Sequence, residues 1–261
     1  GGIINCIDPG GFGTVTITKS ITISCKHVEG SALASSTTGI VINGASVNVV
    51  LRGLDIDGSP PTSPGLNGIR FLQGASLIVE DCVIRRFNGA SPSGNGILVD
   101  NASLTASIHV VNSNITGNGG ASSGAGIQIS PTGTGRATVV ISNSNLVNNT
   151  IGIRASTAAT TGGIGITVTD TTGAGSSTHG FVAEGTSGAV RMMLDRVVSA
   201  NNLGNGVQSI GANAMVRIGS SVLTGNATGV LSTSGGLLQS YGNNQFMGNT
   251  SDGTTTAVSL K

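Results

Sequence analysis

The chain has 261 residues, including 43 Gly, five Phe and one Tyr, and it contains no Trp. Only 9% of the residues are charged and the formal net charge is +1, so nothing drives the chain toward nucleic acid or an anionic membrane surface. The hydrophobic content of 38% argues against disorder, and no run reaches the roughly 18 apolar residues of a transmembrane helix. We therefore expect no nucleic-acid partner and no membrane insertion.

Triplets that begin with Gly and continue with alternating apolar residues recur along the chain. The clearest copies are Gly39-Ile40-Val41-Ile42, Gly68-Ile69-Arg70-Phe71, Gly96-Ile97-Leu98-Val99 and Gly126-Ile127-Gln128-Ile129. Weaker copies begin at Gly152, Gly180, Gly206 and Gly229. On average these Gly residues are about 27 residues apart, a period typical of a solenoid.

A second pattern marks the bends within each period, as in Ile141, Asn143, Leu146 and Asn149. Asn tolerates left-handed backbone geometry and its amide can bond to its copy in the next coil, so each period divides into three short strands. Such strands bury their inner face only by stacking on one another. The sequence predicts an all-β, single-stranded right-handed parallel β-helix of about ten coils, with Phe71, Phe181 and Phe246 inside.

The repeat indicates a single domain over residues 1–261. We expect N-terminal coils at 1–36, regular Gly- and Asn-marked coils at 37–250, and a strand or cap at 251–261. Other solenoids fit less well, because the chain lacks a dense Leu framework, a strict six-residue period and Gly-Gly-x-Gly-x-Asp blocks.

The Gly-led triplets with a downstream Asn resemble the right-handed parallel β-helix repeats of the pectate-lyase-like superfamily over about residues 14–250. The opening, Ile4-Asn5-Cys6-Ile7-Asp8-Pro9-Gly10-Gly11-Phe12-Gly13 and the strands that follow, is similar to bacterial β-helix repeat proteins of unassigned function. The resemblance implies export, extended polysaccharide ligands and, in many members, lyase, hydrolase or epimerase activity. A shared fold does not by itself transfer that chemistry.

Cysteine placement bears on the compartment. Cys6 and Cys25 are about one short coil apart, so they can stack and form a disulfide across the first turn, which fits an oxidising location. The alternative is a pair of unbonded buried thiols. Cys82 is expected to point inward and to be inert, because no basic partner lies beside it. We therefore expect a secreted or cell-surface protein.

Much of the limited charge of the chain gathers in two neighbouring coils, at Arg52, Asp55, Asp57, Glu80, Asp81, Arg85 and Arg86. The carboxylates could hold a hard cation, with Asp55, Asp57 and Asp81 as candidate ligands. An acidic sugar could instead be bound by the Arg side chains, and the candidate ligand-binding residues are Arg52, Asp55, Asp57, Glu80 and Arg85. The other interpretation is a solvated patch in which the acids and Arg neutralise each other.

The same patch offers the candidate catalytic residues. Lyases of the superfamily use calcium held by several carboxylates with an Arg as base, so the resemblance implies Ca²⁺ only if this chain is a lyase. In that case Arg85 and Asp57 are the candidate catalytic residues. The insertion at 59–64 is expected to form one wall of the site.

A third catalytic candidate is His179, because Thr178-His179-Gly180 stands in the register of the Gly-His-Gly of galacturonan hydrolases of this superfamily. The paired Asp residues and the Arg-Ile-Lys segment of those enzymes have no counterpart, and we expect His179 to be an exposed turn residue. Asp100 and Glu184 are three coils apart, roughly 14 Å, which exceeds the roughly 5–9.5 Å of catalytic carboxylate pairs. We expect Glu184 to pair with Arg154 instead.

The outer faces are rich in Ser, Thr, Asn and Gly, and they offer few aromatic rings on which sugars could stack. This composition favours a non-catalytic scaffold, adhesin or fibre subunit without a cofactor. The strand-like start at Gly1-Gly2-Ile3-Ile4 suggests end-to-end self-association, or else the removal of an upstream cap and export signal. The alternatives are a lyase, hydrolase or epimerase acting on an acidic polysaccharide, and a sugar- or phage-related binding module.

Overall fold

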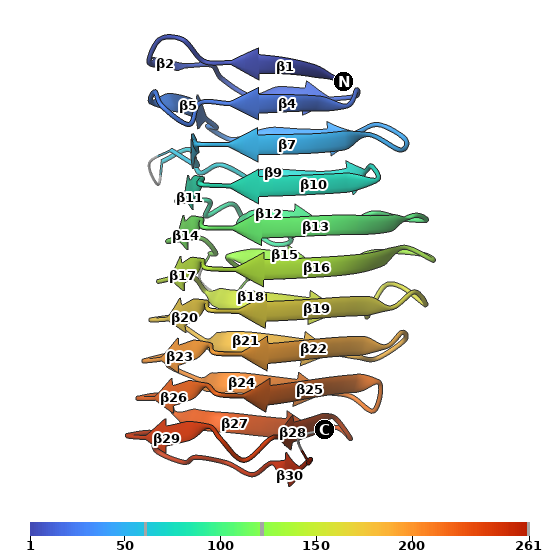
Figure 1. Cartoon of the computed structure of the whole chain (residues 1–261), viewed down its shortest axis with the longest axis vertical. Helices are drawn as coiled ribbons and strands as arrows, with labels where there is room; N and C mark the ends of the chain where they lie inside the picture. The colour runs from blue at the N-terminus through green and yellow to red at the C-terminus, as the bar shows by residue number, and fades with distance from the viewer. Residues whose placement is uncertain (60–61, 121–122, 260–261) are drawn as a thin grey trace.

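Three parallel β-sheets run along the whole molecule, and each turn of the chain contributes one strand to each sheet (Figure 1). The computed structural model describes residues 1–59, 62–120 and 123–259. Within these residues every strand pair is parallel, and each strand lies beside the strand three places along the chain, except that β28 pairs with β30. The predicted three-sheet β-solenoid is therefore confirmed. No helix in the described ranges is long and apolar enough to cross a membrane.

Sheet A consists of β1 (Gly2–Asn5), β4 (Ile21–Ser24), β7 (Asn48–Arg52), β10 (Ser76–Glu80), β13 (Thr105–Val111), β16 (Arg136–Ser142), β19 (Ile164–Thr169), β22 (Val190–Asp195), β25 (Ala214–Gly219), β28 (Leu237–Ser240) and β30 (Thr256–Ala257). Sheet B consists of β2 (Gly10–Gly11), β5 (Gly30–Leu33), β8 (Leu54–Asp57), β11 (Val83–Arg85), β14 (Asn114–Thr116), β17 (Asn145–Val147), β20 (Thr172–Ala174), β23 (Val198–Ala200), β26 (Val222–Thr224) and β29 (Gln245–Met247). Sheet C consists of β3 (Val15–Ile17), β6 (Ile40–Asn43), β9 (Asn67–Gln73), β12 (Asn95–Val99), β15 (Ile127–Ile129), β18 (Ile151–Ser156), β21 (His179–Glu184), β24 (Asn205–Ile210) and β27 (Thr228–Thr233).

The Gly-led triplets form sheet C, the aliphatic runs form sheet A and the segments before the Asn bends form sheet B. Sheet C has nine strands in the described part of the chain, so nine coils carry all three strands, slightly fewer than expected. The coils are irregular in the connections from sheet B to sheet C and from sheet C to sheet A, both of which vary in length (Figure 1).

The core is a set of vertical columns of aliphatic side chains. Val49, Leu77, Ile108 and Val139 occupy paired positions on successive strands of sheet A, and each is at most 1% exposed. Phe71 and Phe181 are fully buried, and Phe246 packs partly buried against the core. Burying each such side chain is worth about 1.5–3 kcal/mol, so the stack supplies the main stabilisation of the fold.

In six successive coils, the bend from sheet A to sheet B is made by one non-Gly residue in the left-handed region. Asp81, Asn112, Asn143, Asp170, Arg196 and Ser220 have φ between 49° and 55°. Asn and Asp tolerate this conformation better than most residues, which explains why polar residues recur at the bends in the sequence. The stacked bends predicted from Asn112 and Asn143 are confirmed.

Buried Asn side chains connect the coils at the next corner, between sheets B and C. The Asn149 Oδ1 accepts hydrogen bonds of 3.0 Å from both the backbone N–H and the side-chain amide of Asn118, and its own Nδ2 donates to the Ile115 carbonyl at 2.9 Å. Asn202, Asn226 and Asn249 repeat the arrangement further along. Ser176 interrupts the ladder, and its buried hydroxyl has no partner.

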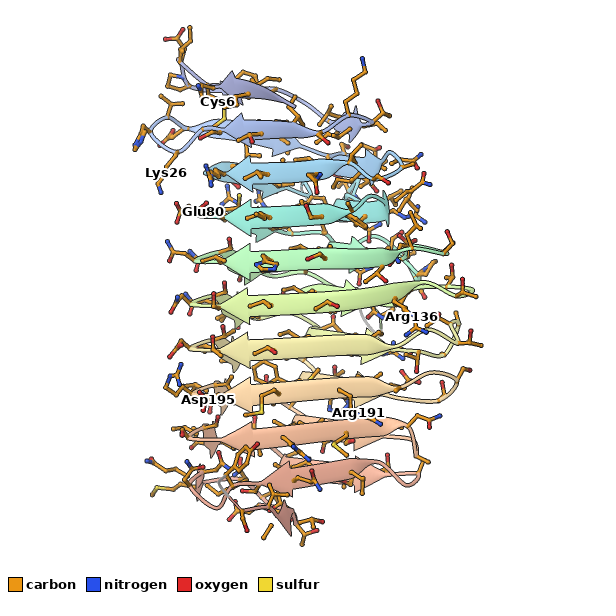
Figure 2. All side chains as sticks on the ribbon, turned by 45° about the vertical axis from the view of Figure 1, so that its right-hand side comes forward. Cys6, Lys26, Glu80, Arg136, Arg191 and Asp195 are labelled. Atoms are coloured by element: carbon orange, nitrogen blue, oxygen red, sulfur yellow. A yellow bond between two sulfur atoms is a disulfide. The ribbon has the colours of Figure 1, made fainter. Side chains whose placement is uncertain are left out.

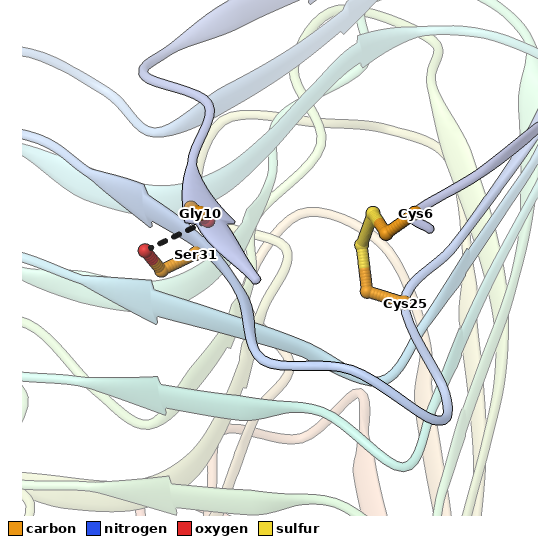
Figure 3. The surroundings of a disulfide bond; sticks show 4 residues. All are labelled: Cys6, Gly10, Cys25 and Ser31. Atoms are coloured by element: carbon orange, nitrogen blue, oxygen red, sulfur yellow. Dashed lines mark hydrogen bonds between the residues drawn. A yellow bond between two sulfur atoms is a disulfide. The ribbon is translucent and has the colours of Figure 1, made fainter. Parts of the chain in front are cut away.

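The first coil is joined to the second by a disulfide between Cys6 and Cys25 (Figure 3). Asn5 pairs with Ser24 at the end of β1 and β4, so the two Cys that follow are stacked, with 4.8 Å between their Cα atoms. The Ser31 hydroxyl also donates to the Gly10 carbonyl between β5 and β2. These contacts hold the terminal coil against its neighbour.

We predict that Asn149→Ala lowers the free energy of unfolding by about 1–3 kcal/mol, because it leaves buried donors and an acceptor of Asn118 and Ile115 without partners. The matched control is Asn145→Ala, which removes an exposed amide of the same coil that bonds Asn114. It should change the free energy by less than about 0.5 kcal/mol. Chemical denaturation measures both. Equal losses in the two variants would contradict the assignment of the buried ladder as the stabilising one.

Candidate functional site

The structure divides the predicted charged patch into two clusters on adjacent sheets. Asp55 and Asp57 lie on β8 of sheet B, where Asp57 pairs with Arg85 of β11. Arg52 and Glu80 lie on sheet A, where they pair across β7 and β10. The residues are one coil apart, as predicted, but a corner of the solenoid separates Glu80 from the two aspartates.

The Asp57 cluster consists of Asp55, Asp57, Arg85 and Arg86. Arg85 donates from Nη2 to the Asp55 Oδ2 at 2.6 Å, and its Nε lies 3.2 Å from the Asp57 Oδ2. Arg86 donates from Nε to the Asp57 Oδ1 at 2.9 Å and also bonds the other Asp57 oxygen. Both carboxylates are therefore held by guanidinium groups of the next coil.

Asp57 is the buried member of this cluster, with 9% of its side chain exposed against 53% for Arg86. Burial tends to raise the pKa of Asp57, but hydrogen bonds from Arg86 and the Ser59 N–H, together with the charges of Arg86 and Arg85, outweigh it and lower the pKa. The bond to Asp57 also raises the pKa of Arg86. Asp57 is thus ionised at neutral pH and does not hold a proton to donate.

The Glu80 cluster consists of Lys26, Arg52, Glu80 and Asp81 (Figure 2). Arg52 donates from Nε to the Glu80 Oε2 at 2.6 Å, and the Lys26 Nζ lies 3.0 Å from the Asp81 Oδ2. Hydrogen bonds from Asn112 and Lys26 lower the pKa of Asp81, and the bond to Asp81 raises the pKa of Lys26. This cluster also consists of mutually neutralising charges.

A groove of about 960 Å³ lies beside both clusters, and the segment from Cys25 to Gly30 forms one side of it. Lys26, Asp55 and Asp81 line it together with His27 and Glu29. The predicted wall at 59–64 is only partly described: Ser59 is buried and bonds Asp57, while Pro60 and Pro61 lie outside the described residues. The groove is the opening through which a ligand could reach these charges.

The arrangement does not suit Ca²⁺, which takes roughly six to eight oxygen ligands. The oxygens of Asp55 and Asp57 accept from Arg85 and Arg86, and Asp81 belongs to the other cluster. In the described ranges no group of three or more His, Cys, Asp or Glu is placed to hold a metal ion. Calcium binding at Asp55, Asp57 and Asp81 stays a prediction, and we derive no chemical step through it.

Sheet C carries two further ion pairs on its outer face. Arg154 donates to the Glu184 Oε2 at 2.6 Å, which confirms the expected pair, and Arg70 donates to the Asp100 Oδ2 at 2.7 Å. Asp100 and Glu184 are each committed to a different Arg. These two carboxylates therefore do not form a pair of the kind used in glycoside cleavage.

His179 is not the exposed turn residue that we expected. It is the first residue of β21, half-buried, and its Nδ1 accepts a hydrogen bond of 2.9 Å from the Asn205 N–H. Burial and, to a smaller degree, the charge of Arg154 lower the pKa of His179, so the ring is neutral at pH 7. Since Asn205 lies on the next strand, the imidazole helps to join two coils.

Cys82 is buried and points into the core, as expected. Burial raises the pKa of its thiol to about 11, so the thiolate needed for nucleophilic chemistry does not form at neutral pH. Its Sγ approaches the carbonyls of Glu80 and Leu51. We assign Cys82 to the core.

Lys26 was missed in the sequence interpretation, although it completes the Glu80 cluster. The signal was available: Lys26, Gly53 and Asp81 follow one another at nearly the repeat period, so they stack at the same corner. The short coil between Cys6 and Cys25 broke the regular spacing and hid this register.

Comparison with known proteins supports the fold assignment. A family model described as a right-handed β-helix region matches residues 5–171. No curated protein sequence matches the chain.

Solved structures extend the match over the whole length. The crystal structure of pectate lyase Pel9A has a TM-score of 0.65 and 13% identity, over 98% of this chain and 68% of the lyase. A module of the mannuronan C-5 epimerase AlgE4 from Azotobacter vinelandii scores 0.46 with 13% identity, over 100% of this chain and 91% of the module. The Dettilon tailspike protein scores 0.46 with 11% identity, and 61% of its chain is covered. At these identities the likeness is one of fold.

We predict that the Asp57 cluster makes stability depend on pH at the acidic end. The native pKa of Asp57 lies below the unfolded value of about 3.9, so the ionised carboxylate stabilises the fold above that pH. The contribution is lost as the pH falls through the native pKa. Asp57→Asn should lower the free energy of unfolding at pH 7 by about 1–3 kcal/mol and flatten its fall below pH 4.

Urea denaturation at several pH values tests this. The control is Asp8→Asn, since Asp8 is exposed in the first coil. Its pH profile should match that of the unchanged protein. A profile for Asp57→Asn as steep as that of the unchanged protein would remove Asp57 as the source of the acid sensitivity.

Proposed function

Because the chain belongs to the right-handed β-helix family, we propose that it is a secreted or cell-surface scaffold, adhesin or fibre subunit without catalytic activity. The observation that carries this proposal is the pairing of its candidate catalytic charges. Asp55, Asp57 and Glu80 each accept hydrogen bonds from an Arg of a neighbouring coil. These charges stabilise the stack and are not poised for proton transfer.

Catalysis in this setting would need at least one group with a pKa matched to its task. Asp57 has a lowered pKa because Arg86 and the Ser59 N–H bond it, and Arg85 is engaged by two carboxylates. His179 is neutral but faces a backbone N–H. The ion pairs would have to break before either cluster could act on a substrate.

The extracellular location is supported by the disulfide between Cys6 and Cys25, since disulfides form and persist in oxidising compartments. The surface is consistent with that role. Ser, Thr, Asn and Gly dominate the outer faces, and most Arg and Lys side chains are neutralised by a carboxylate.

The alternative function is that of a lyase, hydrolase or epimerase acting on an acidic polysaccharide. The groove beside the two clusters favours it, because Asp55 lines this groove and Arg85 bonds Asp55. An enzyme would use Arg85 and Asp57 after the ligand had displaced the Arg86 bond.

We predict that a panel of uronate-containing polysaccharides, incubated with and without calcium, yields no unsaturated products and no new reducing ends. Arg85→Ala and Asp57→Ala should behave like the unchanged protein in the same assay, because neither side chain acts on substrate. Product formation is followed by ultraviolet absorbance and by a reducing-sugar assay. Products that disappear in Arg85→Ala or Asp57→Ala would establish the enzyme instead.

The proposed scaffold role includes end-to-end self-association through the first coil. Apolar side chains are exposed there, with Ile3 at 69%, Ile4 at 51%, Ile7 at 84% and Phe12 at 60%. Ile4, Ile7 and Phe12 border a hollow of about 460 Å³ that also reaches Ile23 and Leu54. In the described chain β1 has a strand partner on one side only, and a second copy stacked on this edge would pair with its backbone and cover these side chains.

We predict that the protein shows concentration-dependent association in size-exclusion chromatography with light scattering, and that Ile4→Lys with Ile7→Lys abolishes it. The matched control is Leu203→Lys, because Leu203 is 76% exposed on the side of the solenoid. A monomer at all concentrations, or an equal effect of Leu203→Lys, would exclude association through the first coil.

A further inference from the structure

The outer face of sheet A carries a hollow of about 580 Å³ over its later strands, far from the clusters described above. It extends over β16, β19, β22 and β25, which span about 14 Å at the usual spacing of strands, and it reaches Tyr241, the residue after β28. Arg191, which lies on this face in Figure 2, borders the hollow together with Met193, Met215, Arg217 and Tyr241.

Two Gly residues shape this surface. A Cβ at Gly165, which pairs with Arg191, would meet no atom within 4 Å, so the missing side chain leaves open space on the outer face. A Cβ at Gly219 would lie 3.0 Å from the Tyr241 Cδ2, so the absence of a side chain there makes room for the ring. The hollow and its aromatic border therefore come from the sequence of the strands themselves.

The two cations of the hollow differ from most others on the molecule. Arg191 donates from Nη1 to the carbonyls of Val190 and Asn213, and Arg217 donates from Nε to the Gln239 Oε1. In the described residues neither has a carboxylate within 4.0 Å, whereas Arg52, Arg70, Arg85, Arg86, Arg154 and Arg196 all do.

These bonds to neutral acceptors hold each guanidinium in place without cancelling its charge. A guanidinium has five N–H donors, so Arg191 and Arg217 keep donors for a ligand. On the neighbouring strands β22 and β25, Arg191 pairs with Met215 and Arg217 pairs with Met193, so the two cations lie diagonally to one another at the border of the same hollow.

The rest of the lining is suited to the face of a ring. Tyr241 is the one Tyr of the chain, and Met193 and Met215 are half-buried, soft apolar side chains beside it. A second hollow of about 640 Å³ shares Met193, Arg217 and Tyr241, and continues past Asn243 and Asp195, whose carboxylate is paired with Arg196. The combined groove fits several linked rings.

We propose that this groove on sheet A binds an acidic oligosaccharide, with Arg191 and Arg217 on its carboxylates and Tyr241 and the two Met against its ring faces. A carboxylate is the group that a guanidinium binds in bidentate fashion. Nucleic acid is disfavoured, because two cations on a chain of net charge +1 neutralise few phosphates. The inference rests on the proposed function, since it names what the non-catalytic scaffold would hold.

The probe is a galacturonate oligosaccharide of defined length, and its methyl-esterified form is the uncharged control ligand. Isothermal titration calorimetry should show binding of the acid form, weakened by salt, and at least about tenfold weaker binding of the ester, equivalent to about 1.4 kcal/mol. Arg191→Ala and Arg217→Ala should each weaken binding by a similar factor. Arg136→Ala should not, because Arg136 is exposed on the same sheet outside the groove (Figure 2).

Gly165→Phe fills the hollow from a strand position where a large aromatic residue is favoured, so it should abolish binding without lowering the thermal midpoint. Binding of the acid and ester forms with equal affinity, loss of binding in Arg136→Ala, or preference for a single-stranded oligonucleotide would each overturn the proposal. No binding of the acid form would do so as well.

The same samples are analysed for cleavage after each titration, so that the two proposals fail separately. Cleaved oligosaccharide would contradict the non-catalytic role, whatever the affinity of the groove. Intact oligosaccharide without binding would contradict the groove alone.

Discussion

The structure depends on the in-register stacking of parallel strands from one coil to the next. Each strand is too short to bury its inner face alone, and the backbone groups of a coil are paired only by its two neighbours. The aliphatic columns through Leu77 and Ile108 and the buried amides of Asn118 and Asn149 both exist because equivalent positions meet at every turn. Register between coils is therefore the property on which the core, the corners and the surface all rest.

The surface charges follow from the same constraint. Arg52 and Glu80, Arg70 and Asp100, and Arg154 and Glu184 are 28 or 30 residues apart in sequence, and each pair spans one coil. A charge placed on one coil thus meets its counterion on the next. Exposed pairs of this kind contribute little stability individually, but they leave most of the outer surface without a net local charge. Arg191 and Arg217 differ from this background, because neither has a carboxylate partner among the described residues.

The sequence predicted the parts of the structure that are periodic. The Gly-led triplets, the inward Phe71 and Phe181, the bends at Asn112 and Asn143, and the pair of Arg154 with Glu184 all occur at fixed phases, and all are confirmed. The candidate site was harder to predict, because its residues can be assigned to sheets only when the corner at which each strand ends is known. Asp57 and Glu80 are near in sequence phase, yet a bend at Asp81 and its equivalents places them on different sheets.

His179 shows a second limit of the sequence. A His beside a turn Gly looked exposed, but the loop before β21 is short enough to place the ring against the next coil, where Asn205 donates to it. The groove on sheet A could not be predicted from the types of residue in the sequence. Its Gly165 and Gly219 resemble the many turn Gly of this chain, and only the strand register shows that they lie on an outer face with Arg191 and Tyr241 around them.

The separation of the two surface regions has a consequence for how such a molecule can evolve or be altered. A solenoid couples each coil mainly to its neighbours, so a change at β8 and β11 has little physical route to β22 and β25, five coils or roughly 24 Å away. Surface residues on one coil pair can then be replaced while the aliphatic columns and the Asn ladder stay intact. Because the fold tolerates such local change, the chemistry of each surface depends on its own residues, and our two proposals for this chain concern separate surfaces.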